Sequence, residues 1–222
     1  MIIEFFGLSN SGKSVLKREL EKKGYKVSKP EKISRTMKFF LFIKHLILNP
    51  LNSLYLFNKL NSNRIRINLS PEKKSLIRKM RNSYLAGVLA KYEYLKNKKE
   101  KIFTDEFSFQ ALFMILQKKS NEKEIRKIIK KLPKSEYLFL FEGNKEWRHK
   151  AYQKKHPIHS GTLMPGSGID KDYAEEWMEI MEYNFEIIKK IIFEDYKEDK
   201  ETFKELKFKY PKILRKNEKN IK

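Results

Sequence analysis

The chain has 222 residues, a formal net charge of +22 and no cysteine. This length suffices for one α/β domain with its own core and an inserted helical piece. The missing cysteines exclude structural disulfides and thiolate metal sites. No signal peptide is visible, so we expect a cytoplasmic protein. The most apolar stretch, residues 39–48, is interrupted by Lys44 and His45 and is too short to cross a bilayer, so we expect no transmembrane segment.

The excess of positive charge allows two interpretations. It favours a polyanion as partner, either nucleic acid or an anionic membrane surface. The lysines are nevertheless spread over helix faces that we expect to be solvated, such as those of Lys17, Lys22 and Lys127, and form no single block. Nucleic acid is therefore an alternative partner that the sequence does not favour.

The N-terminus predicts a strand, a loop and a helix. Residues 2–6 form an apolar run of buried-strand length, and the helix after the loop places Val15, Leu16 and Leu20 on one face. Between them, residues 7–14 complete the pattern G-x-x-x-x-G-K-[ST] of a phosphate-binding P-loop. The flanking strand and helix are the context that this motif requires, because backbone N–H groups and a helix N-terminus must point at one phosphate.

Phosphate binding gives a physical reason for each residue type in this loop. Gly7 and Gly12 let the backbone approach phosphates without obstruction by a Cβ. Asn10 stands where many such loops carry a third glycine, and asparagine tolerates positive φ. Lys13 is expected to reach the β- and γ-phosphates, and the Ser14 hydroxyl to bind Mg²⁺. The predicted cofactors are ATP and Mg²⁺, and the predicted cofactor-binding residues are Gly7, Asn10, Ser11, Gly12, Lys13, Ser14 and Val15.

A short strand at residues 25–28 and a helical insertion at residues 36–97 are predicted next. Within the insertion, the predicted helices are 36–48, 51–60 and about 71–97. Asn49-Pro50 separates the first two, and Ser70-Pro71 is a typical helix start. We expect the insertion to bind the acceptor of a transferred group, and a membrane-surface role for residues 39–48 is an alternative. Candidate ligands for an acceptor phosphate are Arg35, Arg64, Arg66, Arg78 and Arg81.

The second half of the chain alternates strands and helices. We predict strands at 101–106 and 137–141, and helices at 107–118, 121–132, 172–190 and 200–210. Residues 191–196 either continue the preceding helix or form a last strand. This alternation predicts one three-layer α/β domain over residues 1–222, with a mostly parallel central sheet of about five strands.

Two acids and a basic segment are the candidates for chemistry beyond the P-loop. Asp105 and Glu106 end a predicted strand, where a parallel sheet presents its ligand-binding edge. One carboxylate can hold Mg²⁺, and the other can accept the proton of an attacking hydroxyl or orient the acceptor. Glu106 can also simply lie near a helix N-terminus, where the dipole favours it. Residues 143–170 are expected to form a lid, on which Arg148 stabilises the transferring phosphoryl group.

A GTPase and a zinc site both fit the sequence poorly. A GTPase needs Asn-Lys-x-Asp after a strand, and residues 144–147 begin this pattern but end in Trp147, which cannot accept hydrogen bonds from guanine. The spacing of His149, His156 and His159 suits no common zinc site.

The arrangement resembles the nucleoside and nucleotide kinases among P-loop proteins, the thymidylate-kinase-like and adenylate-kinase-like group. The resemblance lies in residues 4–14, in residues 103–107 and in the basic segment around Arg148. It implies a five-stranded parallel sheet, Mg-ATP as donor and a small phosphate or hydroxyl acceptor. The matching site residues are Lys13, Ser14, Asp105 and Arg148. Glu106 stands where thymidylate kinases carry arginine, so the resemblance does not identify the acceptor.

The sequence thus predicts an ATP-dependent phosphotransferase that acts on a nucleoside, a nucleotide or a similar hydroxyl compound. Its expected catalytic residues are Lys13, Asp105, Glu106 and Arg148, and its expected metal ligands are Ser14 and Asp105. The alternative is a P-loop ATPase or nucleotide-binding module associated with nucleic acid. The acceptor, the choice between ATP and GTP and the oligomeric state stay open.

Overall fold

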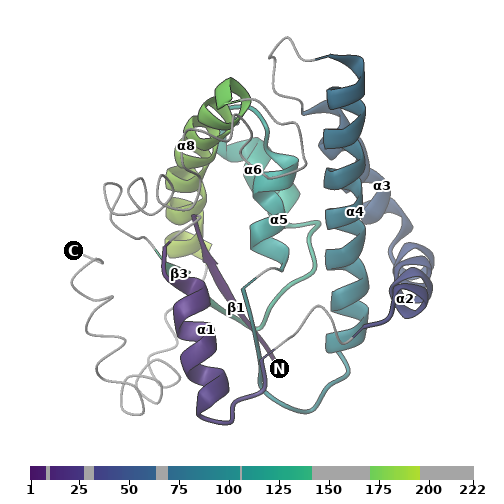
Figure 1. Cartoon of the computed structure of the whole chain (residues 1–222), viewed down its shortest axis with the longest axis vertical. Coiled ribbons are helices and arrows are strands. Elements are labelled where there is room, and N and C mark those ends of the chain that lie inside the picture. Colours follow the sequence, from purple (N-terminus) through teal and green to yellow (C-terminus); the bar gives the residue numbers. More distant parts are fainter. Residues whose placement is uncertain (9–10, 28–32, 64–69, 106, 142–170, 196–222) are drawn as a thin grey trace.

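The computed structural model describes residues 1–8, 11–27, 33–63, 70–105, 107–141 and 171–195. In chain order the elements are β1 (Ile2–Gly7), α1 (Lys13–Lys22), α2 (Arg35–Leu48), α3 (Pro50–Ser62), α4 (Pro71–Leu95), β2 (Ile102–Thr104), α5 (Ser108–Ile115), α6 (Glu122–Ile129), β3 (Tyr137–Phe141) and α8 (Lys171–Asp195) (Figure 1). Several sequence-based candidates lie outside the described residues: Asn10, Arg64, Arg66, Glu106, Arg148, the three histidines at 149, 156 and 159, the segment 143–170 and the helix expected at 200–210.

The sheet is parallel, as expected, with β1 in the centre of the order β2-β1-β3. Glu4 lies opposite Thr104 on one side of β1, and Gly7 lies opposite Phe141 on the other. Within the described residues the sheet has three strands, fewer than the five expected. Of the strand expected at 25–28, the described residues 25–27 contribute one isolated parallel bridge, between Val27 and Phe103.

The end of the chain's described part is helical. Residues 191–195 belong to α8, so of the two readings of this segment the helix is correct and the strand is wrong. An apolar segment that follows a helix extends that helix when its apolar residues keep the helical spacing and so stay on the buried side. Ile191 and Ile192 are both buried in the main core cluster.

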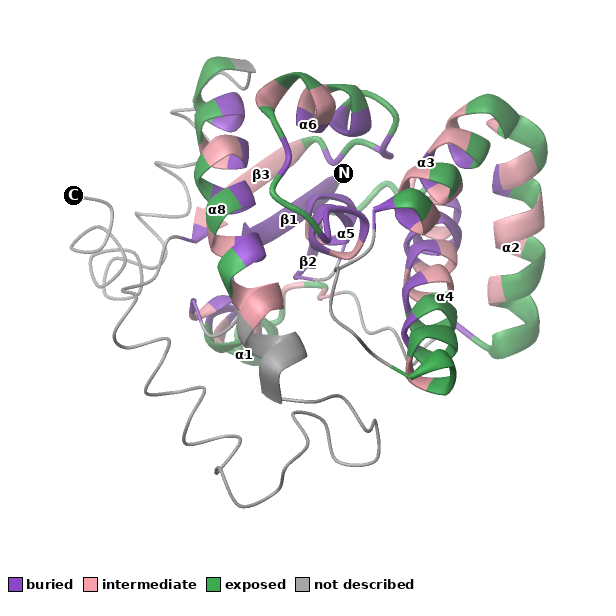
Figure 2. Cartoon of the chain, turned by 90° about the horizontal axis from the view of Figure 1, so that it is seen from above, coloured by how far each residue is buried: buried purple, intermediate pink, exposed green. Residues whose placement is uncertain are grey.

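The two faces of β1 are covered by different layers, because side chains alternate along a strand. Ile2 and Phe6 belong to a large cluster built with α4, α5, α6 and α8. Ile3 and Phe5 pack against Leu16 and Leu20 of α1. Figure 2 shows the buried residues on the inward sides of the helices around the sheet. Val15, expected on the apolar face of α1, is instead 52% exposed.

Helices α2, α3 and α4 fill the segment before β2. The break at Asn49-Pro50 is as expected: α2 ends at Leu48, α3 starts at Pro50, and the two helix axes are bent by 110°. Ser70 caps α4 as expected, since its Oγ accepts a hydrogen bond from Lys73 N at 3.3 Å. Within the described residues no single helix is long and apolar enough to cross a membrane. Helices α2 and α3 taken together, although bent, reach the required length and apolar composition.

Candidate functional site

Gly12, the second glycine of the motif, has a backbone conformation that residues with a side chain rarely adopt. Gly12 precedes α1 with φ of 99°, in the left-handed region where a side chain is strained. Its carbonyl oxygen starts the helix by accepting hydrogen bonds from Val15 N at 3.0 Å and Leu16 N at 3.2 Å. Ser11 N donates to Leu8 O at 3.3 Å and closes the turn before it.

Lys13 points back into this loop. Its Nζ donates to Gly7 O at 2.5 Å and to Leu8 O at 2.8 Å, and it lies 3.4 Å from Ser11 Oγ. The residue is buried, although it is the first residue of a surface helix. A charged ammonium is therefore held among backbone carbonyls at the carboxyl end of the central strand.

Gly7 is required by the neighbouring strand as well as by the loop. A Cβ on Gly7 would lie 2.3 Å from Phe141 O and 2.9 Å from Phe141 Cβ. Such distances do not occur between real atoms, so β1 and β3 can approach this closely only because residue 7 is glycine. The sequence predicted this glycine for phosphate approach, and strand packing is a second reason that the motif alone does not contain.

Asp105 reaches the loop from the end of β2. Its Oδ2 accepts a hydrogen bond from Ser14 Oγ at 3.4 Å, and its Oδ1 forms an ion pair with Lys17 Nζ at 2.7 Å. The carboxylate is mostly buried, with 11% of its side chain exposed. Lys17 was expected on a solvated helix face, and this expectation is wrong, because its ammonium turns inward to the carboxylate one helix turn after Lys13.

The donor set at this position suits Mg²⁺. The Ser14 hydroxyl and the Asp105 carboxylate are hard oxygen donors, and Mg²⁺ is commonly held by one or two carboxylates together with waters and substrate phosphates. Among the described residues no group of three or more His, Cys, Asp or Glu is placed to hold a metal ion by protein ligands alone. Ser14 and Asp105 therefore fit a metal that is shared with bound phosphates better than a structural metal site.

A second carboxyl group, Glu4, is buried in the middle of β1. Its Oε1 accepts hydrogen bonds from Phe109 N at 2.7 Å and Gln110 N at 3.3 Å, at the N-terminus of α5. Burial raises the pKa of Glu4 to about 8, although these backbone donors and the charge of Lys91 lower it. The group is thus mostly protonated at neutral pH. A single acid inside the apolar run 2–6 was the available signal, and sequence analysis did not use it.

Lys91 of α4 is another buried charge that the sequence did not single out. Its Nζ donates to Thr104 Oγ1 at 2.6 Å, and Thr104 directly precedes Asp105. Successive residues of a strand point to opposite faces. Lys91 and the loop before α1 therefore approach the end of β2 from its two sides, at the adjacent residues Thr104 and Asp105.

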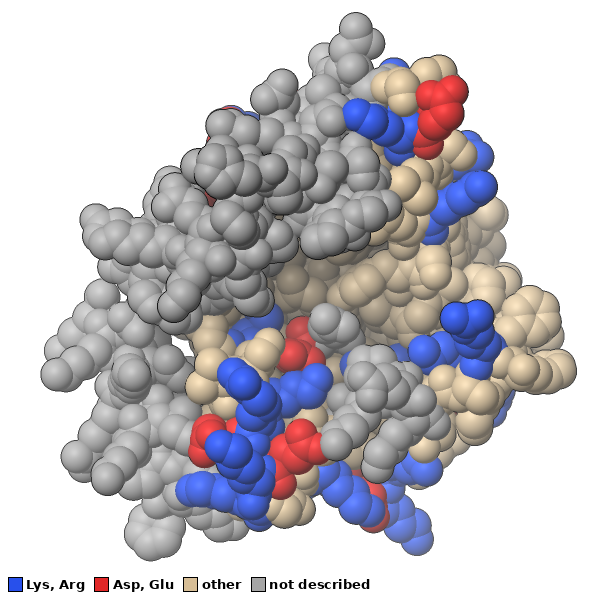
Figure 3. Space-filling view, viewed as in Figure 1, with Lys and Arg blue, Asp and Glu red and all other residues tan. Residues whose placement is uncertain are grey.

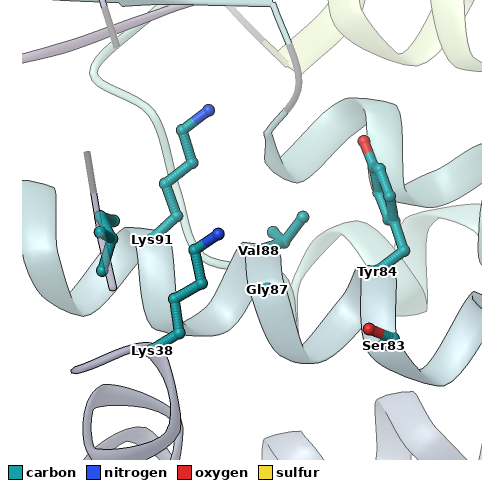
Figure 4. Close-up of a pocket in the computed structure, with 7 residues that line it drawn as sticks. Lys38, Ser83, Tyr84, Gly87, Val88 and Lys91 are labelled. Carbon is teal, nitrogen blue, oxygen red and sulfur yellow. The ribbon is translucent and has the colours of Figure 1, made fainter. Parts of the chain in front are cut away.

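A pocket of about 140 Å³ opens beside Lys91. Two lysines line it, Lys38 from α2 and Lys91 from α4, and Figure 4 shows both side chains projecting in the same direction with Tyr84 at the other end. The remaining lining residues are Ile33, Ser83, Gly87 and Val88. Two ammonium groups beside a small cavity suit one anionic group, whereas ligand pockets for whole drug-sized molecules usually have about 300–1,000 Å³.

Of the arginines expected to bind an acceptor phosphate, the three that the structure describes do not line this pocket. Arg81 is buried, and its guanidinium donates to Met114 O at 2.8 Å and to Asn63 O at 2.8 Å, so it joins α4 to two neighbouring segments. Arg35 and Arg78 are exposed and do not line the pocket. On the described surface of the face in Figure 3, blue and red side chains are mixed over α1, without a uniformly basic area there.

Comparisons with models of protein families, with curated proteins and with solved structures find no match to this chain. The functional interpretation therefore depends on the residues and their geometry.

Proposed function

We propose that this protein is an ATP-dependent phosphotransferase of the P-loop kinase type. The observation that carries the proposal is the meeting of Lys13, Ser14 and Asp105 at the carboxyl end of the parallel sheet. Parallel α/β sheets bind ligands at this edge. The triphosphate would lie along residues 7–14, and the cytoplasm, where ATP is abundant, is the proposed location. The five-stranded sheet of the kinase family would need strands beyond the described residues.

The proposed reaction moves the γ-phosphoryl group to an acceptor oxygen. The bond from the γ-phosphorus to the β–γ bridging oxygen breaks, a bond from the acceptor oxygen to phosphorus forms, and ADP leaves. Glu106 would take the acceptor proton, because Asp105 is assigned to Mg²⁺. Arg148 would stabilise the charge on the transferring group. Mg²⁺, held by Ser14 and Asp105 when bound, would neutralise charge on the phosphates.

The acceptor is proposed to carry an anionic group, and the pocket between α2 and α4 supports this. Lys38 and Lys91 offer positive charge beside a small cavity of about 140 Å³. Replacing Lys38 by Met should raise the acceptor KM at least about tenfold, the effect of losing one charge-assisted hydrogen bond, and leave the KM for ATP unchanged. Lys44→Met on the same helix is the control, because Lys44 is exposed and does not line the pocket.

Nucleotide binding is tested first, with titration of Mg-ATP into the Lys13→Ala variant. The variant should lose triphosphate binding, because the ammonium that would contact the phosphates is gone. It should keep its fold. Lys22→Ala is the matched control, since Lys22 lies on the same helix with 72% of its side chain exposed. Binding of Mg-ATP to Lys13→Ala with the affinity of the parent chain would disprove the P-loop assignment.

Turnover separates the kinase from its alternative. ADP release is followed with Mg-ATP and a panel of nucleosides, nucleoside monophosphates, sugars and short oligonucleotides. Stimulation by one small-molecule class supports the kinase, and Glu106→Gln should then lower transfer far more than ATP binding. The net charge of +22 favours the alternative, an ATPase associated with nucleic acid. Stimulation by oligonucleotides alone would replace the kinase with this alternative.

A further inference from the structure

Exposed apolar side chains are concentrated on α2 and α3. Of the twelve large apolar residues that are exposed among the described ones, seven lie in this short stretch, with exposed fractions from 44% to 79%. We call them the α2–α3 apolar surface: Met37, Phe39, Phe40, Ile47, Leu48, Leu51 and Leu54. A contiguous apolar surface on a charged protein usually marks an interaction site.

The surface is held in place from behind. His45, on the opposite side of α2, is buried and its Nδ1 lies 2.9 Å from Glu93 Oε1 of α4. Phe42 packs on Phe57 of α3, with ring centroids 5.9 Å apart. Helix α2 is the outermost helix at one edge of the molecule in both views (Figures 1 and 2). The exposed side chains thus belong to well-anchored helices and face away from the core.

The charge around this surface has one sign. From Ile33 to Asn63 the chain carries four Lys or Arg residues and no Asp or Glu. Arg35 and Lys44 of α2 are exposed, and neither has an ion-pair partner among the described residues. Figure 3 shows blue Lys and Arg side chains next to tan, uncharged residues along the edge formed by α2.

This combination fits an anionic bilayer better than a second copy of the chain. Two copies facing each other would bring like charges together, and the stretch has no carboxylate to neutralise them. Anionic headgroups neutralise Arg and Lys, while aromatic and aliphatic side chains enter the boundary between headgroups and acyl chains. The 110° bend gives two short helices that can lie in one plane, without the single long helix that crossing needs.

We propose that the α2–α3 apolar surface docks this protein on an anionic membrane surface, with both helices lying in the interfacial layer. The docking is independent of the kinase activity proposed above, because no residue of the surface belongs to the P-loop or to the lysine pocket.

Cosedimentation of the full chain with vesicles tests the proposal. The chain should bind vesicles of equal parts phosphatidylglycerol and phosphatidylcholine and bind pure phosphatidylcholine at least about tenfold more weakly. The triple variant Phe40→Ser/Ile47→Ser/Leu51→Ser should lose at least about tenfold in affinity for the anionic vesicles. The control is Leu76→Ser/Met80→Ser on α4, where both residues are 39% exposed, and it should bind as the parent chain does.

A site-specific probe reports where the protein touches the lipid. Because the chain has no cysteine, a single Ile47→Cys or Tyr183→Cys can be labelled with an environment-sensitive dye. The emission should shift to shorter wavelength on anionic vesicles for position 47 and stay unchanged for position 183 on α8. The proposal is wrong if the parent chain does not bind, if the triple variant binds equally well, or if the surface instead forms dimers that the triple substitution abolishes.

Discussion

At the scale of single residues, Gly7 is needed both for the packing of β1 against β3 and for the loop after β1. A Cβ at this position would meet Phe141 O at 2.3 Å, and backbone of a central sheet cannot move aside cheaply. Gly7→Ala should therefore lower the free energy of unfolding by about 1–3 kcal/mol, as overpacking of a core does. Urea unfolding followed by circular dichroism measures the change.

A second glycine provides a control, for which the expected change in the free energy of unfolding has the opposite sign. Gly87 lies inside α4, and a Cβ added there meets nothing within 4 Å. Gly87→Ala should raise the free energy of unfolding by about 0.5–1 kcal/mol, because alanine loses less backbone entropy in a helix. Equal effects of the two substitutions would refute the steric explanation for Gly7.

Glu4 makes stability depend on pH in a window that the structure defines. Its pKa rises from the ordinary value of 4.5 to about 8, so the folded state holds a proton that the unfolded chain has lost. The stabilisation is complete below pH 4.5 and is lost as the pH rises through 8. At ~1.4 kcal/mol per pKa unit, the loss amounts to several kcal/mol.

Glu4→Gln removes this titration and keeps the shape of the side chain. The variant should gain stability relative to the parent chain as the pH rises from 5 to about 8.5, a range that spans the pKa of Glu4. The measurement is the difference in free energy of unfolding between the two proteins at each pH. A constant difference over this range would mean that Glu4 is ionised in the fold.

The pattern in residues 7–14 predicted the turn and the helix after it, and the apolar run that ends in two acids at 105–106 predicted Asp105 at the end of a strand. The partners of the buried charges could not be predicted. Lys17, Arg81 and Lys91 are indistinguishable in sequence from the solvated residues of the same type. What separates them is the partner, such as Asp105 or Thr104, that tertiary packing brings near.

At the scale of elements, a buried pair joins α2 to α4. Burial would raise the pKa of Glu93, but hydrogen bonds and charges from Lys96 and His45 outweigh it and lower the pKa. His45→Phe keeps the ring contact with Tyr92 and removes the hydrogen bond to Glu93. It should cost about 1.5–3 kcal/mol, the range for hydrogen bonds to charged groups.

The loss should appear locally. Hydrogen exchange of α2 amides should become about 10–100 times faster in His45→Phe, while exchange in the sheet stays as it is. Lys44→Ala, a neighbouring change on the exposed side of α2, should leave all amides unaffected. Uniform acceleration throughout the chain would show that the pair stabilises the whole fold and not the attachment of α2.

Strong local signals predicted the elements well. Ser70-Pro71 marked the start of α4, and residues 137–141 match β3 in full. The helix expected at 107–118 is shorter, Ser108–Ile115, because an apolar run alone does not show where backbone hydrogen bonding ends. The strand at 25–28 was the weakest prediction, and a stretch of four residues cannot form a strand unless the neighbouring strand pairs along its length.

At the scale of the molecule, the net charge of +22 should make stability depend on salt. Unbalanced positive charge repels itself in the compact state. Raising NaCl from about 0.01 to about 0.15 M shortens the screening length from ~30 to ~8 Å. The thermal midpoint should therefore rise, although surface pairs such as Lys119–Glu179 weaken.

Sulfate at equal ionic strength separates screening from other effects of the salt. If the thermal midpoint rises as much in sulfate as in NaCl, screening alone acts. A larger rise in sulfate combines binding of the divalent anion with the exclusion of sulfate from the protein surface. A thermal midpoint that falls with NaCl would show that the surface ion pairs contribute more than the repulsion does.

The contacts of Lys13 affect how strongly any anion can bind this loop. Its ammonium is already satisfied by Gly7 O and Leu8 O, so an arriving phosphate competes with the protein's own carbonyl groups for it. The affinity then reflects only the difference between two sets of hydrogen bonds. On departure, the same carbonyls can accept hydrogen bonds from the ammonium again. The loop thus contains its own competing ligand, and we expect an anion to bind more weakly there than to an ammonium without such partners.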